Sequence, residues 1–103
     1  MRVISQKKIK DFYEQPFGEK VKIPLQQWYC NVKNRKYRSL SQILVDFDNT
    51  IRVKGLYIFD IDGGKCKIAT SIYFDTGCVY IRFVGTDADY KKFIAELKTE
   101  GTE

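Results

Sequence analysis

The chain has 103 residues and a mass of 12.1 kDa, room for one small domain, and its 44% apolar and 30% charged residues are typical of a globular protein. Eighteen Lys and Arg residues against thirteen Asp and Glu residues give a net charge of +5, a moderate hint of a polyanionic partner. No apolar run approaches the roughly 18 residues of a membrane span, and residues 1–10 lack the apolar core of a signal peptide. We therefore expect a cytoplasmic protein with one domain over residues 1–98 and a flexible polar tail over residues 99–103.

The absence of histidine restricts the chemistry further. Without histidine, Ser-His-Asp and Cys-His nucleophile systems and His-ligated zinc are excluded. Cys30, Cys66 and Cys78 are odd in number and share no C-x-x-C spacing, so neither a disulfide framework nor a zinc cluster is expected. Any catalysis must therefore use Lys, Arg, Tyr, Asp or Glu.

The first half of the chain is expected to be mainly helical. Residues 1–4 alternate as in an edge strand, and Ser5 is expected to cap a helix that ends before Pro16. Pro24 suits the first turn of a second helix, and Ser39 is expected to cap a third. Their apolar positions, spaced i, i+3, i+4 and i+7, are Leu25, Trp28, Tyr29 and Val32 in the second helix and Leu40, Ile43, Leu44 and Phe47 in the third.

The second half changes to an extended pattern. Three strands are expected, at residues 56–62, 65–74 and 78–84, with turns at Asp62-Gly63-Gly64 and Asp75-Thr76-Gly77. A last helix is expected from Thr86 or Asp87, with Tyr90, Phe93, Ile94 and Leu97 facing inward. Helices followed by an antiparallel meander and a helix predict an α+β domain. Its buried residues are expected to include Trp28, Ile43, Phe47, Val79, Ile81 and Phe83.

The last hairpin predicts a polar sheet face. If each strand buries its more apolar set, the opposite face carries Lys67, Ser71, Tyr73, Tyr80 and Arg82. Such a face offers phosphate-binding cations beside rings on which bases can stack. On pattern alone it can also be an ordinary solvated face, as the most basic stretch, residues 33–38, can be a solvated helix end.

Signatures of cofactor binding are absent from the sequence. There is no P-loop, dinucleotide-binding glycine motif or calcium loop. Asp60 and Asp62 lie two residues apart on one strand, as metal ligands can, but Asp62 is better explained as a turn residue. We therefore expect neither a metal nor another cofactor.

Residues 80–90, YIRFVGTDADY, closely resemble the Y-I-R-F-V-G-T-H-x-E-Y ending of HigB-type toxins, in the RelE-like superfamily of bacterial toxin–antitoxin systems. The order and spacing of other segments agree, namely R-V-I-S at 2–5 with Lys7 and Lys8, Trp28-Tyr29, residues 39–47 and Phe59-Asp60-Ile61. The resemblance implies that residues 1–98 form a RelE-like toxin domain, with N-terminal helices packed on a small antiparallel sheet and a C-terminal helix.

The resemblance also implies an activity. Such toxins are endoribonucleases that cleave mRNA, usually on the ribosome, and are inhibited by a HigA-type antitoxin with a helix-turn-helix domain. They need no metal, because the RNA 2′-hydroxyl attacks the adjacent phosphate and leaves a cyclic phosphate and a free 5′-hydroxyl. The reaction needs a base, a cation on the phosphate and an acid for the leaving oxygen, which Lys, Arg and Tyr can supply.

Four catalytic candidates follow from the resemblance, residue by residue. Arg82 matches the arginine of Y-I-R and is expected to hold the scissile phosphate, the alternative being a structural ion pair. Lys67 stands where the family usually has arginine, which keeps the charge but loses the bidentate geometry. Tyr90 either contacts RNA or fixes the last helix, and Asp87 can act as a carboxylate base. Further RNA contacts are expected from Lys7, Lys8, Lys65, Tyr73 and Tyr80.

Three departures from the family pattern leave the activity open. Asp87 replaces a histidine, Gly64 falls on an asparagine and Ser71 falls on a position that is often arginine, so one acid–base group and one cation are missing. A module that binds RNA or its antitoxin without cutting is therefore an alternative. So is a protein–protein adaptor whose basic face meets an acidic partner. We expect the antitoxin to contact or obstruct the face that carries Lys67 and Arg82.

Overall fold

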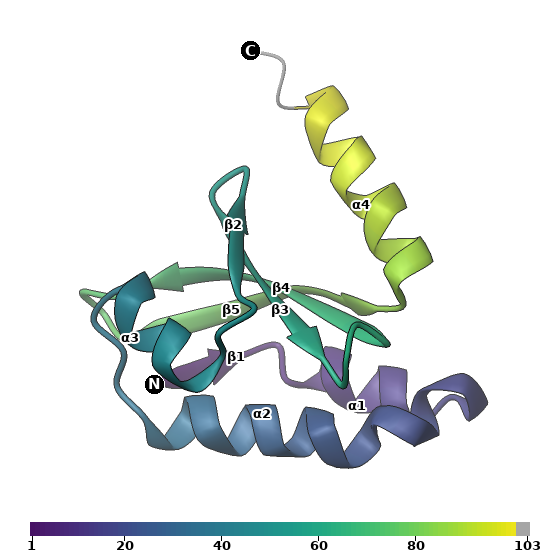
Figure 1. Ribbon diagram of the computed structural model, residues 1–103, viewed down its shortest axis with the longest axis horizontal. Coiled ribbons are helices and arrows are strands. Elements are labelled where there is room, and N and C mark those ends of the chain that lie inside the picture. The colour runs from purple at the N-terminus through teal and green to yellow at the C-terminus, as the bar shows by residue number, and fades with distance from the viewer. Residues whose placement is uncertain (101–103) are drawn as a thin grey trace.

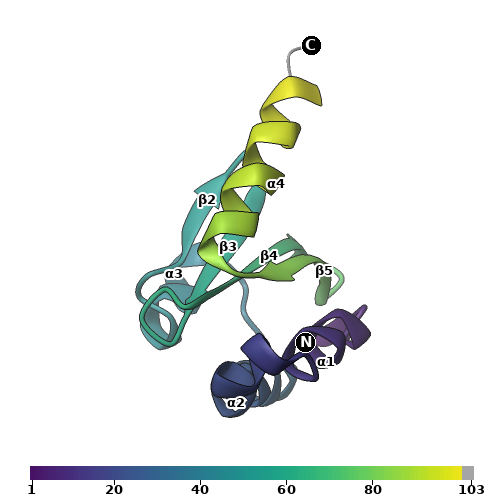
Figure 2. The ribbon, with the colours of Figure 1, turned by 90° about the vertical axis from the view of Figure 1, so that its right-hand side faces the viewer.

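The computed structural model describes residues 1–100, with side chains as far as Leu97. Its elements, in chain order, are β1 (Arg2–Ile4), α1 (Lys7–Tyr13), the 3₁₀ helix η1 (Pro16–Val21), α2 (Lys22–Asn34), α3 (Leu40–Asp46), β2 (Ile51–Val53), β3 (Leu56–Ile61), β4 (Cys66–Tyr73), β5 (Cys78–Gly85) and α4 (Asp87–Glu100). Figures 1 and 2 show α1 and α2 beneath the sheet, while α4 rises from its other side. The architecture is α+β, as the order of the elements predicts.

The sheet has five strands in the order β1-β5-β4-β3-β2. The predicted meander of β3, β4 and β5 is antiparallel, and the predicted edge strand β1 pairs with β5 in parallel, so the sheet is mixed rather than antiparallel. Strand β2, which the sequence pattern does not predict, is only three residues long and pairs with β3. Lys54 and Gly55 turn the chain between them with φ of 54° and 81°, a backbone that the flanking apolar pattern does not reveal.

The main core lies between the sheet and the helices beneath it. Three residues of the expected apolar stripe of α2, Leu25, Trp28 and Val32, are each at most 1% exposed, while the fourth, Tyr29, is half-buried. Trp28 packs edge-on against Phe59 of β3, with ring centroids 5.2 Å apart. Ile43 of α3 closes the same core, as its position in the third helix predicts.

Neither serine expected to cap a helix does so with its side chain. Ser5 has a left-handed backbone (φ 72°) that turns the chain out of β1, and α1 begins only at Lys7. Ser39 does precede α3, but its side chain makes no capping bond. Instead, the Gln42 side chain accepts the backbone N–H of Arg38 at 2.8 Å.

A β-bulge between β4 and β5 changes which side chains face the core. Ala69 lies opposite Phe83 and Thr70 lies opposite Ile81, so Arg82 is an extra residue in β5. Ile81 remains buried, at 2% exposure, while Phe83 joins Ala69 on the other face and is only half-buried. The expectation that Phe83 shares the core with Ile81 is therefore wrong, because simple alternation does not survive a bulge. Phe47, also expected to be buried, is half-buried at the edge of the core, where it packs edge-on against Phe59.

Helix α4 is attached to the sheet by its first turns. Phe93 stacks on Phe83 with centroids 4.9 Å apart, and the inward positions Tyr90, Ile94 and Leu97 are half-buried. The helix continues to Glu100, and the rest of the expected polar tail, residues 101–103, lies outside the described residues. Among the described helices, none is long and apolar enough to cross a membrane.

Candidate active site

The residues of the predicted polar face do lie on one face of the sheet, on the side of α4. The register places Ser71 opposite Tyr80 and Tyr73 opposite Cys78. Their side chains lie on the face opposite to that of Ile68, Thr70 and Ile72, with which Ser71 and Tyr73 alternate along β4. Arg82 is exposed on this face while Ile81 points into the core, as predicted. The side chains form two clusters rather than one.

The first, the Lys67 cluster, consists of Lys67, Asp60, Asp87 and Tyr90. Lys67 Nζ lies 2.7 Å from Asp60 Oδ1 and 4.0 Å from Asp87 Oδ1, and its side chain is only 18% exposed. Asp87, the first residue of α4, also pairs with Lys91 at 3.3 Å. Two carboxylates therefore surround the predicted catalytic cation, so it is held in place and its charge is compensated.

Asp60 is the site residue that the sequence analysis did not include. It lies directly opposite Lys67 in the β3–β4 register, and its Oδ1 atom is fully buried. The available signal was its place in the F-D-I segment, where the resembled family has asparagine. An acid at that position, opposite a lysine where an arginine is usual, is a charge pair that only the strand register can reveal.

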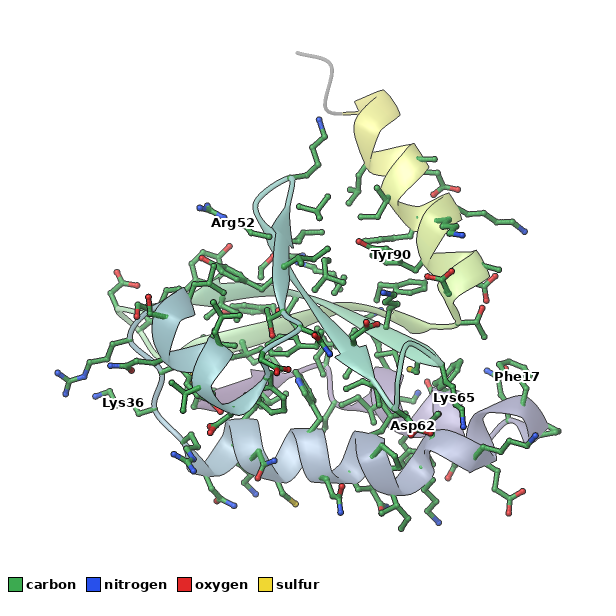
Figure 3. The ribbon with its side chains drawn as sticks, viewed as in Figure 1. Phe17, Lys36, Arg52, Asp62, Lys65 and Tyr90 are labelled. Carbon is green, nitrogen blue, oxygen red and sulfur yellow. The ribbon has the colours of Figure 1, made fainter. Side chains whose placement is uncertain are left out.

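Tyr90 covers the Lys67 cluster from α4. Its ring centroid lies 5.4 Å from Lys67 Nζ, and Figure 3 shows the side chain reaching from the helix toward β2 and β3. Burial raises the pKa of the Tyr90 phenol, with Asp87 and Asp60 adding to the rise and Lys67 opposing it. The phenol thus stays protonated at neutral pH and can donate a proton.

The second, the Arg82 cluster, consists of Arg82, Ser71, Tyr73 and Tyr80. Arg82 Nε donates to Ser71 Oγ at 2.9 Å, and the guanidinium lies 5.9 Å from the centre of the Tyr80 ring. Tyr73 packs edge-on against Tyr80 at 5.5 Å and is 48% exposed. Among the described residues no carboxylate pairs with Arg82, so the alternative of a structural ion pair finds no support there and the cation faces solvent.

The two clusters lie side by side along the strands. Lys67 is opposite Gly85, and Arg82 precedes Gly85 by three residues, about 10 Å along a strand. The Ala69–Phe83 pair lies between them. Gly85 has a packing role here, since a Cβ atom at that position would lie 2.5 Å from the Phe83 ring.

The other lysines that we expected to bind RNA, Lys7, Lys8 and Lys65, lie outside both clusters. Lys65 pairs with Asp62 at 3.5 Å in the β3–β4 turn (Figure 3). Lys7 and Lys8 belong to α1, on the opposite side of the sheet.

Asp62 has φ of 53° and is the turn residue that we expected. Among the described residues, no three His, Cys, Asp or Glu side chains are arranged to hold a metal ion.

Two sequence features acquire a structural explanation. Gly64 has φ of 92°, a left-handed conformation that favours glycine or asparagine, and a Cβ there would lie 3.9 Å from Asp60 Oδ1. A side chain at position 64 would therefore begin beside the Lys67 cluster.

In the basic stretch 33–38, the buried Tyr37 hydroxyl donates to Asp46 at 2.6 Å and Arg35 pairs with Asp46 at 3.4 Å, so both residues hold this segment against α3.

Comparison with known proteins agrees with the motif at 80–90. Residues 21–93 match the family model described as HigB_toxin, RelE-like toxic component of a toxin-antitoxin system. The chain is 28% identical over 102 residues to the "mRNA interferase toxin HigB" of Escherichia coli K12, with 98% of each chain covered. The proteins named "mRNA interferase HigB" from Escherichia coli O157:H7 and Shigella flexneri match with the same identity and coverage. The chain therefore belongs to the HigB family of RelE-like toxins of toxin–antitoxin systems.

Proposed function

We propose that this protein is an mRNA endoribonuclease toxin that cleaves ribosome-bound message through attack of the RNA 2′-hydroxyl. The observation that carries the proposal is a proton donor, a fixed cation and a carboxylate gathered in the Lys67 cluster, on the same face as the exposed guanidinium of Arg82. The names of the relatives, mRNA interferases, support the same substrate.

Each group has a task in this reaction. Arg82 holds the scissile phosphate and compensates the charge that grows on it in the transition state. The phenol of Tyr90, which burial keeps protonated, donates its proton to the leaving 5′-oxygen. Asp87, at the start of α4, accepts the proton of the 2′-hydroxyl, and Lys67 supports the phosphate charge. No step requires a metal or another cofactor.

The exposed tyrosines supply the RNA contact. Tyr73 and Tyr80 present aromatic surface next to Arg82, which suits stacking by an unpaired base whose phosphate the guanidinium binds. An RNA strand that lies along β5 passes from the Arg82 cluster to the Lys67 cluster. Single-stranded RNA is the substrate that this arrangement favours.

A toxin of this kind requires an inhibitor. We propose a HigA-type helix-turn-helix antitoxin, in the cytoplasm where the message is translated, whose acidic groups cover the face with Lys67 and Arg82. Charge complementarity with a toxin of net charge +5 steers this association. Its association rate should then fall as salt rises, and salt-independent binding at the opposite face would argue against such charge masking.

The product ends test the mechanism. Cleavage of a defined message, free and ribosome-bound, is expected to leave a 2′,3′-cyclic phosphate and a 5′-hydroxyl at each mapped site. A 2′-O-methyl group at the mapped nucleotide is expected to abolish cleavage there, because it removes the attacking hydroxyl. Products with 5′-phosphate ends, or cleavage that survives the 2′-O-methyl group, would overturn the mechanism.

One observation favours a second candidate, a module that binds RNA or antitoxin without cutting. Asp60 and Asp87 compensate the charge of Lys67, which reduces its attraction for phosphate. This candidate predicts that RNA binds and antitoxin binds while neither the wild-type protein nor Asp87→His cleaves ribosome-bound message. Growth arrest on induction, relieved by the antitoxin gene, separates the toxin from this alternative.

A further inference from the structure

A groove on the helical layer has no part in the proposed reaction. It runs between α1 and α2, which lie side by side on the opposite side of the sheet from α4 (Figure 2), and it encloses about 600 Å³. Its lining is mainly apolar, since Ile9, Tyr13, Tyr29 and Cys30, here called its floor, lie among Gln6, Lys7, Lys10 and Gln26. A second hollow of about 590 Å³ shares Lys10 and Tyr13 with it and extends it toward η1.

The charges around this groove are mostly of one sign. No carboxylate lines the main groove between α1 and α2, and the ammonium groups of Lys22 and Lys33 lie 5.4 and 5.7 Å from the rings of Tyr13 and Tyr29. Glu14, which pairs with Lys10 at 3.9 Å, and Glu19 line only the extension toward η1. Beside the groove, Ile23 on α2 is 60% exposed and lines a further hollow that shares Cys30. The surface therefore combines an apolar floor with cationic edges.

The helical structure of the groove walls determines which kind of peptide can bind there. Both walls are helices, whose N–H and C=O groups are already paired, so the groove has no strand edge to which an extended peptide could bond. A helix satisfies its own backbone and can lay an apolar stripe between two others. RNA is a poor occupant, because the floor is apolar and offers the phosphates no continuous polar contact.

We propose that this groove binds an amphipathic helix with an apolar stripe and acidic flanks, supplied by the antitoxin. The inference rests on the proposed toxin function for the identity of the partner, and on the groove itself for the chemistry. Tyr13 and Tyr29 are the contact residues at its floor, and the four lysines pair with the acidic flanks. The groove lies on the opposite layer from the Lys67 and Arg82 clusters, so it gives the antitoxin a second point of attachment besides the face that it covers.

The test uses the full chain and a synthetic peptide probe. The probe is an amphipathic helix of about five turns with a leucine stripe and glutamate flanks, and its matched control carries lysine flanks on the same stripe. Fluorescence anisotropy gives the affinities, and hydrogen exchange gives the protected segments. Cys30→Arg fills the groove from an exposed position, and Lys10→Glu with Lys22→Glu reverses the charge of its edge. Lys36→Glu with Lys54→Glu is a control of equal charge change at exposed lysines elsewhere.

The expected result is binding of the acidic peptide with protection in α1 and α2, and no measurable binding of the lysine peptide. Cys30→Arg and the Lys10/Lys22 pair should each weaken binding about tenfold or more, while the Lys36/Lys54 pair should change it by less than about threefold. Equal binding of both peptides, equal effects of both charge reversals, or protection only at β4, β5 and α4 would each overturn the proposal. Thermal unfolding shows whether a variant is folded, and if Cys30→Arg is not, the two charge reversals and the protection map still decide.

The same variants separate this proposal from the nuclease. Cys30→Arg leaves the residues of both clusters in place, so its RNA cleavage should equal that of the wild type. Loss of peptide binding with unchanged cleavage supports the groove, whereas intact peptide binding in Cys30→Arg refutes it whatever the cleavage assay gives. Absence of cleavage in every variant would refute the nuclease and leave the groove measurement valid.

Discussion

Asp60→Asn should make this protein a tighter RNA binder, because the carboxylate competes with phosphate for Lys67. The contact between Lys67 Nζ and Asp60 Oδ1 is 2.7 Å, and the side chains are 18% and 28% exposed. Asparagine has the same shape and keeps an oxygen that can accept from the ammonium. The substitution therefore removes a negative charge while leaving Lys67 a partner, and the fold should survive with a small change in melting temperature.

The size of the effect follows from the distances. A phosphate oxygen bound to Lys67 would lie about 5 Å from the Asp60 carboxylate, where two unit charges repel by about 0.8 kcal/mol in water and about 3 kcal/mol at an effective dielectric of 20. For a pair that is partly exposed, a value between these limits, about 1–2 kcal/mol, is reasonable. This corresponds to roughly 5- to 30-fold tighter binding. The slope of log affinity against log salt should steepen by about 0.7, as one more phosphate contact forms on a single strand.

The assay is fluorescence anisotropy of a 2′-O-methyl RNA, which keeps the phosphates and cannot be cleaved, at several salt concentrations. Asp62→Asn is the matched control, because this exposed aspartate lies two residues away, pairs with Lys65 and has a left-handed backbone that asparagine tolerates. Unchanged or weaker binding by Asp60→Asn, or an equal gain in Asp62→Asn, would refute the competition argument. Loss of cleavage with tighter binding would instead mark the Asp60 carboxylate as part of the chemistry.

Arg82→Ala should lower cleavage by roughly 10²–10³-fold while RNA binding, measured by anisotropy, weakens far less, because the group acts mainly in the transition state. Tyr90→Phe keeps the ring over Lys67 and removes the proton donor, so single-turnover cleavage should fall by about 10²-fold with an unchanged melting temperature. Because Asp87 is the proposed base, Asp87→His should lower the rate, whereas a higher rate with a pH optimum moved toward neutrality would show that Asp87 only occupies the place of a useful acid–base group. Burial raises the pKa of the Cys66 thiol to about 12, so the stability that this group contributes below about pH 9 should be lost between pH 9 and 12 by up to about 1.4 kcal/mol per pH unit. Because the phenol pKa values of Tyr37 and Tyr90 are raised as well, thermal unfolding of Cys66→Ala should show a shallower dependence on pH than the wild type rather than none.

The sequence predicts the parts of this molecule that depend on local patterns. The stripe of α2, the three-strand meander and the opposite orientations of Ile81 and Arg82 all follow from spacing and alternation. The shared face of Ser71 and Tyr80 follows as well, because the turn between β4 and β5 keeps the register that apolar matching predicts.

Alternation cannot predict the effect of one extra residue in a strand. Nor can it predict contacts between segments that are distant in the sequence. The bulge at Arg82 moves Phe83 out of the core, and nothing in the residue types of β5 indicates it. The Lys67 cluster joins β3, β4 and α4, so the role of Asp60 depends on a strand register and a helix position together. β2 was missed because three residues are too few to establish a period.

The bulge also explains how the two clusters come to share one site. Without the extra residue, Phe83 would point with Ile81 into the core, and α4 would lose the ring on which Phe93 stacks. With it, Phe83 lies on the outer face and holds the first turns of α4 over the sheet, where Tyr90 and Asp87 meet Lys67. Arg82, the extra residue itself, stays exposed as alternation predicts and donates to Ser71. One backbone irregularity thus brings Phe83 to the face of the two clusters and fixes α4 there, as bulges next to active sites often redirect side chains.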